Sequence, residues 1–314
     1  MASQTLLSAE QLTRRFGLHT AVQSVSFSVQ QGEVLGFLGP NGAGKSTTMK
    51  MLTGNLAPDS GRIMINGIDL LDSPKAAKRH IGYLPENPPL YRELTVREFL
   101  LFCGRLHGLS AQSLQSAVDE VLHRCGLETM QQRLIGQLSK GYQQRCGIAQ
   151  AIIHQPEVVI LDEPTSGLDP IQIQQIRQLI RDIAHQHSVI LSTHILPEVE
   201  MLCGRVQIMH QGQLVFSDTL EALQSQRQHA ALRVAFRLPP SVTTLAQLPG
   251  ITHVESLGAQ QFRLHFLPDQ DPTDALINVA VVENWQLTQL TPEQDSLEQL
   301  FTQLVSQETQ GAAA

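Results

Sequence analysis

The stretch that most constrains this chain is Gly39-Pro40-Asn41-Gly42-Ala43-Gly44-Lys45-Ser46, which has the form G-x-x-x-x-G-K-[ST]. An apolar run precedes it at 34–38 and a segment without helix breakers follows it at 45–52, so we expect a strand, a turn and a helix. Glycines let backbone N–H groups turn inward around a phosphate, and the start of a helix adds free donors and partial positive charge. Lys45 is suited to bind the β- and γ-phosphates, and the Ser46 hydroxyl is suited to bind Mg²⁺. The stretch therefore predicts a nucleoside triphosphate site in an α/β fold.

Length and composition indicate an ordinary globular protein with two domains. The chain has 314 residues, of which 42% are hydrophobic and 16% are charged. Its net charge of −7 argues against a general affinity for nucleic acid. No apolar run reaches the roughly 18–20 residues that a membrane span needs, and the first residues lack the character of a signal peptide. We therefore expect the protein in the cytosol.

Two acidic residues follow an apolar run that has the character of a central parallel strand. The run is 158–161, and Asp162 and Glu163 come directly after it. At the end of such a strand Asp162 would lie beside the phosphate loop and could bind Mg²⁺ through water, while Glu163 could orient a water for in-line attack on the γ-phosphate. Two solvated acids at the end of a strand are the simpler alternative, which the phosphate loop makes much weaker.

Two further motifs contain polar groups at the ends of elements. Ser139 and Gly141 lie at the start of a predicted helix, where a hydroxyl and free N–H groups form an anion site. An ordinary N-cap serine is the alternative interpretation. His194 follows a strand predicted at 188–192, at the edge of the sheet where ligands gather, although a lone histidine is more often structural.

These four motifs, in this order, resemble those of the ATP-binding subunit of an ABC transporter over about residues 5–220. The resemblance implies a P-loop NTPase fold, the ABC cassette, in a domain of residues 1–222. Its parts would be a RecA-like core, an antiparallel β edge and a helical subdomain at about 92–136. It also implies an ATPase with ATP and Mg²⁺ as cofactors.

The resemblance assigns roles to individual residues of this sequence. It implies catalytic roles for Lys45, Glu163 and His194, and Mg²⁺ contacts for Ser46, Asp162 and Glu86. The implied ATP-binding positions are Phe16, Val22, Gly39, Pro40, Asn41, Gly42, Ala43, Gly44, Lys45, Ser46, Thr47, Ser139, Gly141 and Asp169. Phe16 would stack on adenine, since stacking requires only a π-face, and a core phenylalanine is the alternative.

The resemblance also implies partners. Family members dimerise head to tail, so that Ser139 and Gly141 of one copy bind the γ-phosphate held by the phosphate loop of the other. Integral membrane permease subunits on separate chains would place the protein at the inner face of the cell membrane, as a peripheral cytoplasmic protein. No nucleic acid partner is expected.

Two motifs depart from the usual family pattern. Glu86 stands where most members have glutamine, in the loop that senses Mg²⁺ and contacts the permease. Lys140 and Tyr142 replace two residues of the usual Ser-Gly-Gly-Gln signature. Both departures resemble ABC-2 type export systems, in which Tyr-Leu-Pro-Glu precedes a proline-rich loop.

The pattern changes after a polar boundary at 224–229. Residues 230–308 follow the order β-α-β-β-α-β with one extra helix, which predicts a small ferredoxin-like α+β domain. A capping box at Thr291 to Gln294 predicts that the extra helix begins there and ends at about 307. Residues 309–314 are predicted to be a disordered tail. The region resembles the C-terminal accessory domain of ABC-2 type ATPases, including those of gliding-motility type.

Two other classes of function compete with a transport ATPase. A soluble ABC ATPase that acts on ribosomes or DNA would carry two cassettes or a long coiled coil, together with a basic stripe, and this sequence has none of these. A regulatory module with an inactive ATPase site is disfavoured because Lys45, Ser46, Asp162, Glu163 and His194 are all present.

Overall fold

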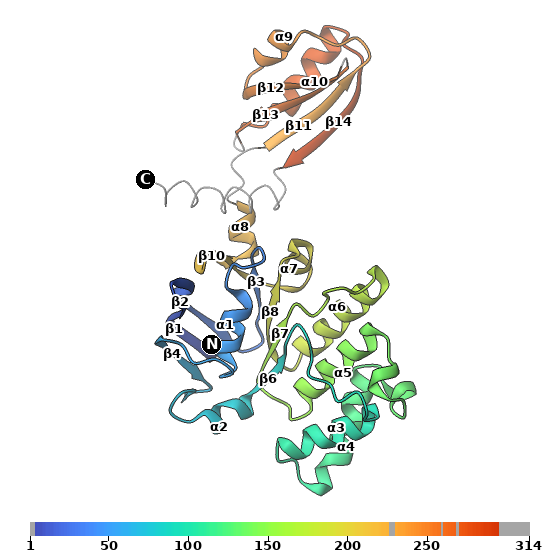
Figure 1. The fold of residues 1–314 in the computed structure, drawn as a ribbon. Coiled ribbons are helices and arrows are strands. Elements are labelled where there is room, and N and C mark those ends of the chain that lie inside the picture. Colours follow the sequence, from blue (N-terminus) through green and yellow to red (C-terminus); the bar gives the residue numbers. More distant parts are fainter. Residues whose placement is uncertain (1–3, 226–229, 259, 268–269, 295–314) are drawn as a thin grey trace. The chain divides into compact units, whose positions relative to one another are not determined.

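The computed structural model describes residues 4–225, 230–258, 260–267 and 270–294. The chain divides between Leu220 and Glu221 into two compact units (Figure 1). Helix α8 (Leu220–Ser225) extends over the first residues of the predicted polar boundary, and the rest of that boundary lies outside the described residues.

A six-stranded sheet forms the centre of the first unit, with the order β10-β9-β3-β8-β7-β6. Its strands from β9 to β6 are parallel, and β10 adds an antiparallel edge. The strands are β3 (Val34–Leu38), β6 (Ile81–Leu84), β7 (Val158–Asp162), β8 (Ser188–Thr193), β9 (Arg205–His210) and β10 (Gln213–Thr219). Strands β7 and β8 are buried along their whole length, which explains why their sequences are apolar runs rather than alternating patterns.

The order of the strands brings the predicted motifs to one edge of this sheet. Strand β3 leads through the phosphate loop into α1 (Lys45–Leu52), and β7 and β8 are the next two strands across the sheet. Parallel strands end at the same edge, so the phosphate loop, Asp162 and His194 meet there although they are far apart in the sequence.

A second, antiparallel sheet has the order β2-β1-β4-β5. Its strands are β1 (Thr5–Phe16), β2 (His19–Gln30), β4 (Ser60–Ile65) and β5 (Ile68–Asp69). Alternate residues of β2, among them Val25, Phe27 and Val29, pack in the core shared with the central sheet, as their alternation with polar residues predicts. Asn66 and Gly67 form the predicted turn between β4 and β5, both with positive φ.

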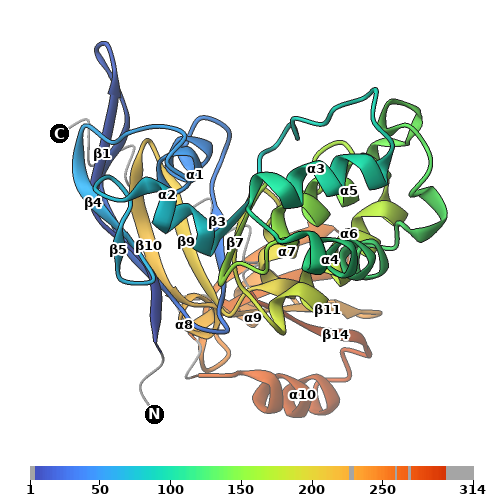
Figure 2. The ribbon, with the colours of Figure 1, turned by 90° about the horizontal axis from the view of Figure 1, so that it is seen from below.

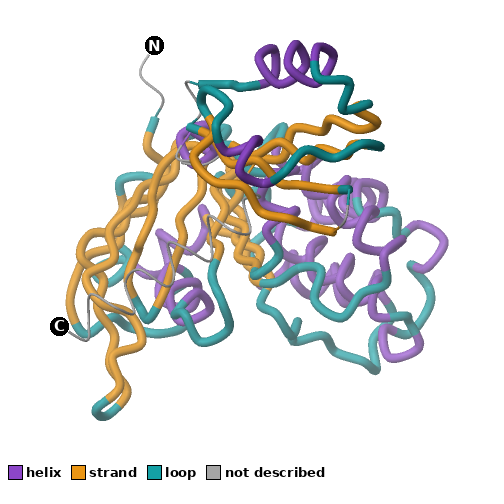
Figure 3. Tube along the Cα trace, turned by 90° about the horizontal axis from the view of Figure 1, so that it is seen from above, coloured by secondary structure: helices purple, strands orange, loops and turns teal. Residues whose placement is uncertain are grey.

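Three helices pack together on the opposite side of the unit from the antiparallel sheet (Figures 2 and 3). They are α3 (Val96–Leu106), α4 (Ala111–Arg124) and α5 (Lys140–Ile152). The predicted capping box is present at the start of α3: the Glu98 N–H donates to Thr95 Oγ1, and the Thr95 N–H donates to the Glu98 carboxylate at 2.9 Å. The buried side chains of α4 recur at helical spacing, so the face that packs follows from the sequence.

The remaining helices of this unit connect or cover the strands. They are α2 (Pro74–Ala77), α6 (Pro170–Ala184), α7 (Leu196–Leu202) and the 3₁₀ helices Lys78–His80, Glu128–Met130 and Ile135–Gln137. Helix α6 begins as its sequence predicts, because Asp169 caps it and Pro170 occupies its first position.

The second unit is a four-stranded antiparallel sheet with two helices. Its elements are β11 (Ala230–Phe236), α9 (Val242–Ala246), β12 (Ile251–Gly258), β13 (Gln261–Phe266), α10 (Thr273–Val282) and β14 (Leu287–Gln294). The sheet order β12-β13-β11-β14, with all neighbouring strands antiparallel, is the ferredoxin-like arrangement that the sequence predicts.

The predicted capping box at Thr291 is wrong. Residues 291–294 belong to β14 and pair with β11, with Thr291 opposite Arg233 and Leu290 opposite Val234. A ladder of backbone hydrogen bonds along a whole strand outweighs one local capping signal, which is why the strand continues. The predicted helix to 307 and the tail at 309–314 lie outside the described residues.

Among the described residues, no helix has the length and apolar character that crossing a membrane requires.

Candidate functional site

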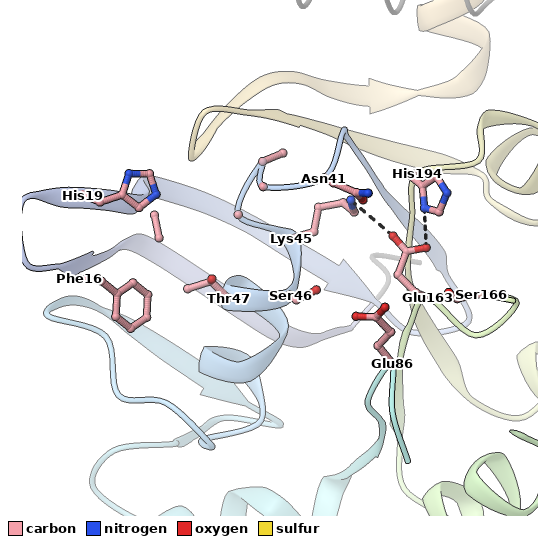
Figure 4. Close-up of a pocket in the computed structure, with 14 residues that line it drawn as sticks. Phe16, His19, Asn41, Lys45, Ser46, Thr47, Glu86, Glu163, Ser166 and His194 are labelled. Atoms are coloured by element: carbon pink, nitrogen blue, oxygen red, sulfur yellow. Dashed lines mark hydrogen bonds and ion pairs between the residues drawn. The ribbon is translucent and has the colours of Figure 1, made fainter. Parts of the chain in front are cut away.

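The phosphate loop borders a cavity of about 520 Å³ at the end of the central sheet (Figure 4). Gly42 and Gly44 have φ of +81° and +105°, which favour glycine. At Gly44 a β-carbon would also lie 2.5 Å from the Ala21 carbonyl oxygen, so the loop approaches β2 too closely for a side chain. The cavity is lined by Phe16, His19, Ala21, Asn41, Gly42, Ala43, Gly44, Lys45, Ser46, Thr47, Glu86, Glu163, Ser166 and His194.

Lys45 is buried at the base of this cavity, and only 5% of it is exposed. Its ammonium donates to the carbonyl oxygens of Gly39 at 2.7 Å and Pro40 at 3.3 Å. It also lies 3.5 Å from Glu163 Oε1. A buried ammonium without an anion would be costly, and Glu163 supplies that charge here. Gly39 and Pro40 therefore act through their carbonyl groups rather than as part of the cavity wall.

Glu163 connects Lys45 to His194. Its other carboxylate oxygen is 2.8 Å from His194 Nδ1 (Figure 4). The residue has φ of +50°, a left-handed conformation that a glutamate adopts at an energetic cost. Its N–H donates to the Ser192 carbonyl at 2.9 Å and its carbonyl accepts from the Ser166 N–H at 3.1 Å, so the surrounding backbone holds it there.

Asp162 and Ser46 provide the oxygen ligands expected of a Mg²⁺ site. The Ser46 hydroxyl donates to Asp162 Oδ1 at 3.2 Å. Burial raises the pKa of Asp162, and the charge of Glu86 raises it further. A hydroxyl and a buried carboxylate at the end of a phosphate loop fit a hard divalent cation. Glu86 lines the same cavity, and among the described residues no hydrogen bond joins it to Ser46 or Asp162.

One end of the cavity is formed by residues of β1 and β2. Phe16 is 49% exposed and lines the cavity, so it is not a core residue, and the Arg14 guanidinium lies 5.0 Å from its ring centre. Val22 requires a correction: it is fully buried in the core, and its neighbour Ala21 lines the cavity instead. The alternation of β2 places these two side chains on opposite faces.

A second cavity, of about 330 Å³, contains the other predicted anion site. Ser139, Gly141 and Asp169 line it, and it has no lining residue in common with the first cavity. Ser139 occupies the N-cap of α5, yet its hydroxyl makes no capping hydrogen bond, unlike Asp169, which accepts from the Gln172 N–H at 2.9 Å. Gly141 packs so closely on Gln172 that a β-carbon would lie 2.8 Å from it.

Three residues of the phosphate cavity were not predicted as site residues: His19, Ala21 and Ser166. His19 pairs with Phe16 across the hairpin of β1 and β2. The sequence contained a signal for His19, because it lies opposite an aromatic residue that was predicted to stack on adenine. Ser166 follows Glu163 on the same loop, and its signal was that 166–169 match the D-loop motif of the family.

Comparisons with known proteins agree with this geometry. Residues 22–166 match the family model described as "ABC transporter". The chain is 35% identical to an uncharacterised ABC transporter ATP-binding protein, YxlF of Bacillus subtilis, over 96% of this chain and 99% of that protein. It is 34% identical to the bacitracin transport ATP-binding protein BcrA of Bacillus licheniformis, over 98% and 99%.

The fold agrees as well. A solved structure of an ATP-binding subunit of an ABC transporter superposes with a TM-score of 0.65 at 34% identity, covering 71% of this chain and 93% of that one. Members of this family bind ATP, normally with Mg²⁺. The chain belongs to the ATP-binding proteins of ABC transporters, and it is an ATPase.

Proposed function

We propose that two copies of this chain close head to tail over two ATP molecules and thereby drive an exporter whose membrane subunits are separate chains. Each phosphate cavity would be completed by Ser139 and Gly141 of the other copy. Closing would then be coupled to ATP binding, and opening to hydrolysis.

The observation that carries this proposal is the separation of the two cavities. The phosphate loop and the start of α5 line different cavities within one copy. Ser139 keeps a hydroxyl that its own helix does not use, at an end of α5 where backbone N–H groups and the helix dipole favour an anion. A second copy can bring that end to the γ-phosphate.

Residue roles follow from the contacts of the phosphate cavity. When triphosphate enters, the Lys45 ammonium would turn from Glu163 toward the β- and γ-phosphates, which replace that carboxylate as its anion. Glu163 would then be free to accept a proton from the attacking water, held by His194 in the required orientation. Asp162 and Ser46 would hold Mg²⁺.

Mg²⁺, when bound, would neutralise charge on the phosphates.

Mixing two inactive variants tests whether the site is shared between copies. Lys45→Ala removes the phosphate cation, and Ser139→Glu places a negative charge where the γ-phosphate would bind. A mixed dimer has both defects in one site and an intact second site. Random pairing in an equal mixture is therefore expected to restore up to about a quarter of the wild-type hydrolysis rate.

The same mixture also shows which result would contradict a site shared between two copies. A site contained within one copy would leave the mixture as inactive as its components, and this would overturn the dimer proposal. Lys45→Ala mixed with Glu163→Gln is the control, because both defects lie in the phosphate-loop half and mixing should restore nothing.

The contact with the permease is proposed at the helical subdomain of about 92–136, the helical insert of the cassette. Tyr91, Phe102 and Leu106 are exposed, at 52%, 36% and 70%, and the rings of Tyr91 and Phe102 lie 5.4 Å apart. Beside this group, a cavity of about 490 Å³ is bordered by α1, β6, the loop after β6 and the end of α3. An exposed apolar group next to a cavity suits a protein partner.

Purification from native membranes tests the transport proposal. The tagged chain is expected to recover an integral membrane protein and to lose it when Leu106 is replaced by Glu, while the ATPase rate of the purified chain stays unchanged. Leu18→Glu is the matched control, since Leu18 is also exposed but lies in the hairpin of β1 and β2. Recovery of ribosomes or DNA without a membrane protein would contradict the proposal.

An ABC-2 type exporter with an accessory C-terminal domain is the class that we propose. Similarity to the bacitracin transport protein extends over 98% of this chain and so includes the second unit. A chain truncated after Gln224 tests whether this unit matters. We expect weaker dimerisation or permease binding, and a truncated chain that matched the full chain in ATPase rate, dimerisation and assembly would leave the unit without this role.

A further inference from the structure

The two motifs that depart from the family pattern each contribute a charged residue to the same cavity, whereas Tyr142 lines the cavity of Ser139. Glu86, which replaces the usual glutamine, and Lys140, which replaces a glycine of the signature, both line a cavity of about 420 Å³. The sequence separates them by the whole helical insert. The other lining residues are Asn87, Pro88, Leu90, Arg92, Gln143 and Gln144.

The charges of Glu86 and Lys140 have no partner among the described residues. Within the described part of the chain, neither the Glu86 carboxylate nor the Lys140 ammonium makes a hydrogen bond or an ion pair. The Lys140 ammonium lies against Gly167, so closely that a β-carbon there would collide with it. Gly167 belongs to the loop that begins with Glu163. Lys140 therefore lies next to the loop that begins with Glu163, and it shares a cavity with the loop that contains Glu86.

Glu86 also borders the phosphate cavity. Of the residues that the structure describes, Glu86 alone lines both the phosphate cavity and the cavity with Lys140. A cation on α5 that attracts the Glu86 carboxylate would therefore shift negative charge away from the phosphate cavity when α5 moves.

We propose that Lys140 is a positioning residue that pairs with Glu86 and so couples the start of α5 to the phosphate cavity of the same copy. The inference rests on the proposed function, because movement of α5 toward the second copy's γ-phosphate brings the pair together. Opposite charges attract across the cavity, so each departure compensates for the other: a glutamate without the lysine would leave excess negative charge beside the phosphates.

Arg92 is the competing cation in this cavity. It precedes α3, and its carbonyl accepts from the Gly136 N–H at 3.1 Å, which ties its backbone to the helical insert. Among the described residues, no hydrogen bond or ion pair joins its side chain to α5 or to the loop after Glu163. Pairing with Arg92 would leave Glu86 without a connection to Ser139, so Arg92 provides a matched control.

A double-mutant cycle on ATP hydrolysis tests the pair. Glu86→Gln and Lys140→Gln are each expected to lower kcat by about threefold to fivefold, with the KM for ATP unchanged within about twofold. The double variant should be no slower than the slower single variant. Lys140→Arg should retain the wild-type rate, and high salt should reduce the difference between wild type and Lys140→Gln, because exposed pairs are screened.

The control is the combination of Glu86→Gln with Arg92→Gln, whose effects on kcat should be independent. Effects of Glu86→Gln and Lys140→Gln that multiply, or coupling with Arg92 instead, would overturn the inference. Both substituted residues are exposed, so thermal unfolding should be unchanged. If the mixed dimers described above regain activity while this cycle shows no coupling, only the pairing of Lys140 with Glu86 is refuted.

Discussion

The two anion sites of the first unit differ in how their polar groups are satisfied. In the phosphate cavity, Lys45 is balanced by two carbonyl groups and Glu163, and Asp162 accepts from Ser46. At the start of α5, the Ser139 hydroxyl has no partner within its own helix. The charge of Lys45 is thus balanced by protein groups before any ligand binds, whereas the Ser139 hydroxyl is a donor that its own helix leaves unused.

This difference suggests that the phosphate cavity and the start of α5 have different tasks in ATP binding and in closure of the dimer. A compensated site must exchange internal contacts for ligand contacts, which selects for a ligand with enough charge to displace Glu163 from Lys45. A site with an unused donor gains contacts without losing any. We therefore expect substitutions of Glu163 and Lys45 to have larger effects than substitutions at the start of α5.

Glu163→Gln should have the largest effect. Removing the proposed base is expected to slow hydrolysis by about 10³-fold while ATP still binds, so that the dimer accumulates. Hydrolysis assays and size-exclusion chromatography with ATP measure both. Glu157→Gln, on an exposed glutamate at the opposite end of β7, is the control. A Glu163→Gln protein that stayed monomeric and hydrolysed ATP at the parent rate would contradict the role.

Lys45→Ala should have the next largest effect. Loss of a charge-assisted contact to phosphate is expected to weaken ATP binding by about tenfold to hundredfold. Fluorescent-nucleotide titration measures the affinity. Lys50→Ala, on the exposed side of the same helix, should leave it unchanged. Equal losses for the two variants would indicate a general electrostatic effect rather than a contact of the phosphate loop.

Ser139→Ala sharpens the comparison because serine usually stabilises a helix from this position. Here the hydroxyl makes no capping bond, so the free energy of unfolding should hardly change, while kcat falls by about tenfold. Thr95→Ala should do the reverse: it breaks a capping box, costs about 1 kcal/mol of stability and leaves kcat intact. Urea unfolding and hydrolysis assays compare the two. A destabilised Ser139→Ala would assign that serine to its own helix.

Phe16→Ala should have the smallest effect. Losing one aromatic stacking partner is expected to raise the Kd for ATP by about threefold. Phe16→Trp keeps a π-face and should restore the affinity. Because Phe16 is half exposed, neither change should alter the melting temperature much. If leucine at this position bound as tightly as tryptophan, burial rather than stacking would explain the contact.

Local signals in the sequence predicted much of the fold. The glycine pattern, the apolar runs of β7 and β8 and the caps at Thr95 and Asp169 each depend on neighbours within a few residues. Thr291 has an equally good local signal, yet pairing with Arg233 on β11 decides its structure. A signal fails where a partner distant in the sequence offers more hydrogen bonds.

The candidate site divides in the same way. The motifs named most residues that line the phosphate cavity, but not His19, Ala21 or Ser166, and they named Val22, which is buried. The free hydroxyl of Ser139 and the cavity common to Glu86 and Lys140 could not be predicted, because both depend on how α5 packs against loops far away in the sequence.

The left-handed backbone of Glu163 has an evolutionary consequence. Glycine or asparagine would adopt that φ more readily, which favours the native state by about 1 kcal/mol. Either residue would also leave the buried Lys45 ammonium without its carboxylate, and that loss opposes the gain. Charge balance therefore retains a strained glutamate at this position, and directed evolution for heat resistance should accumulate its substitutions elsewhere in the chain.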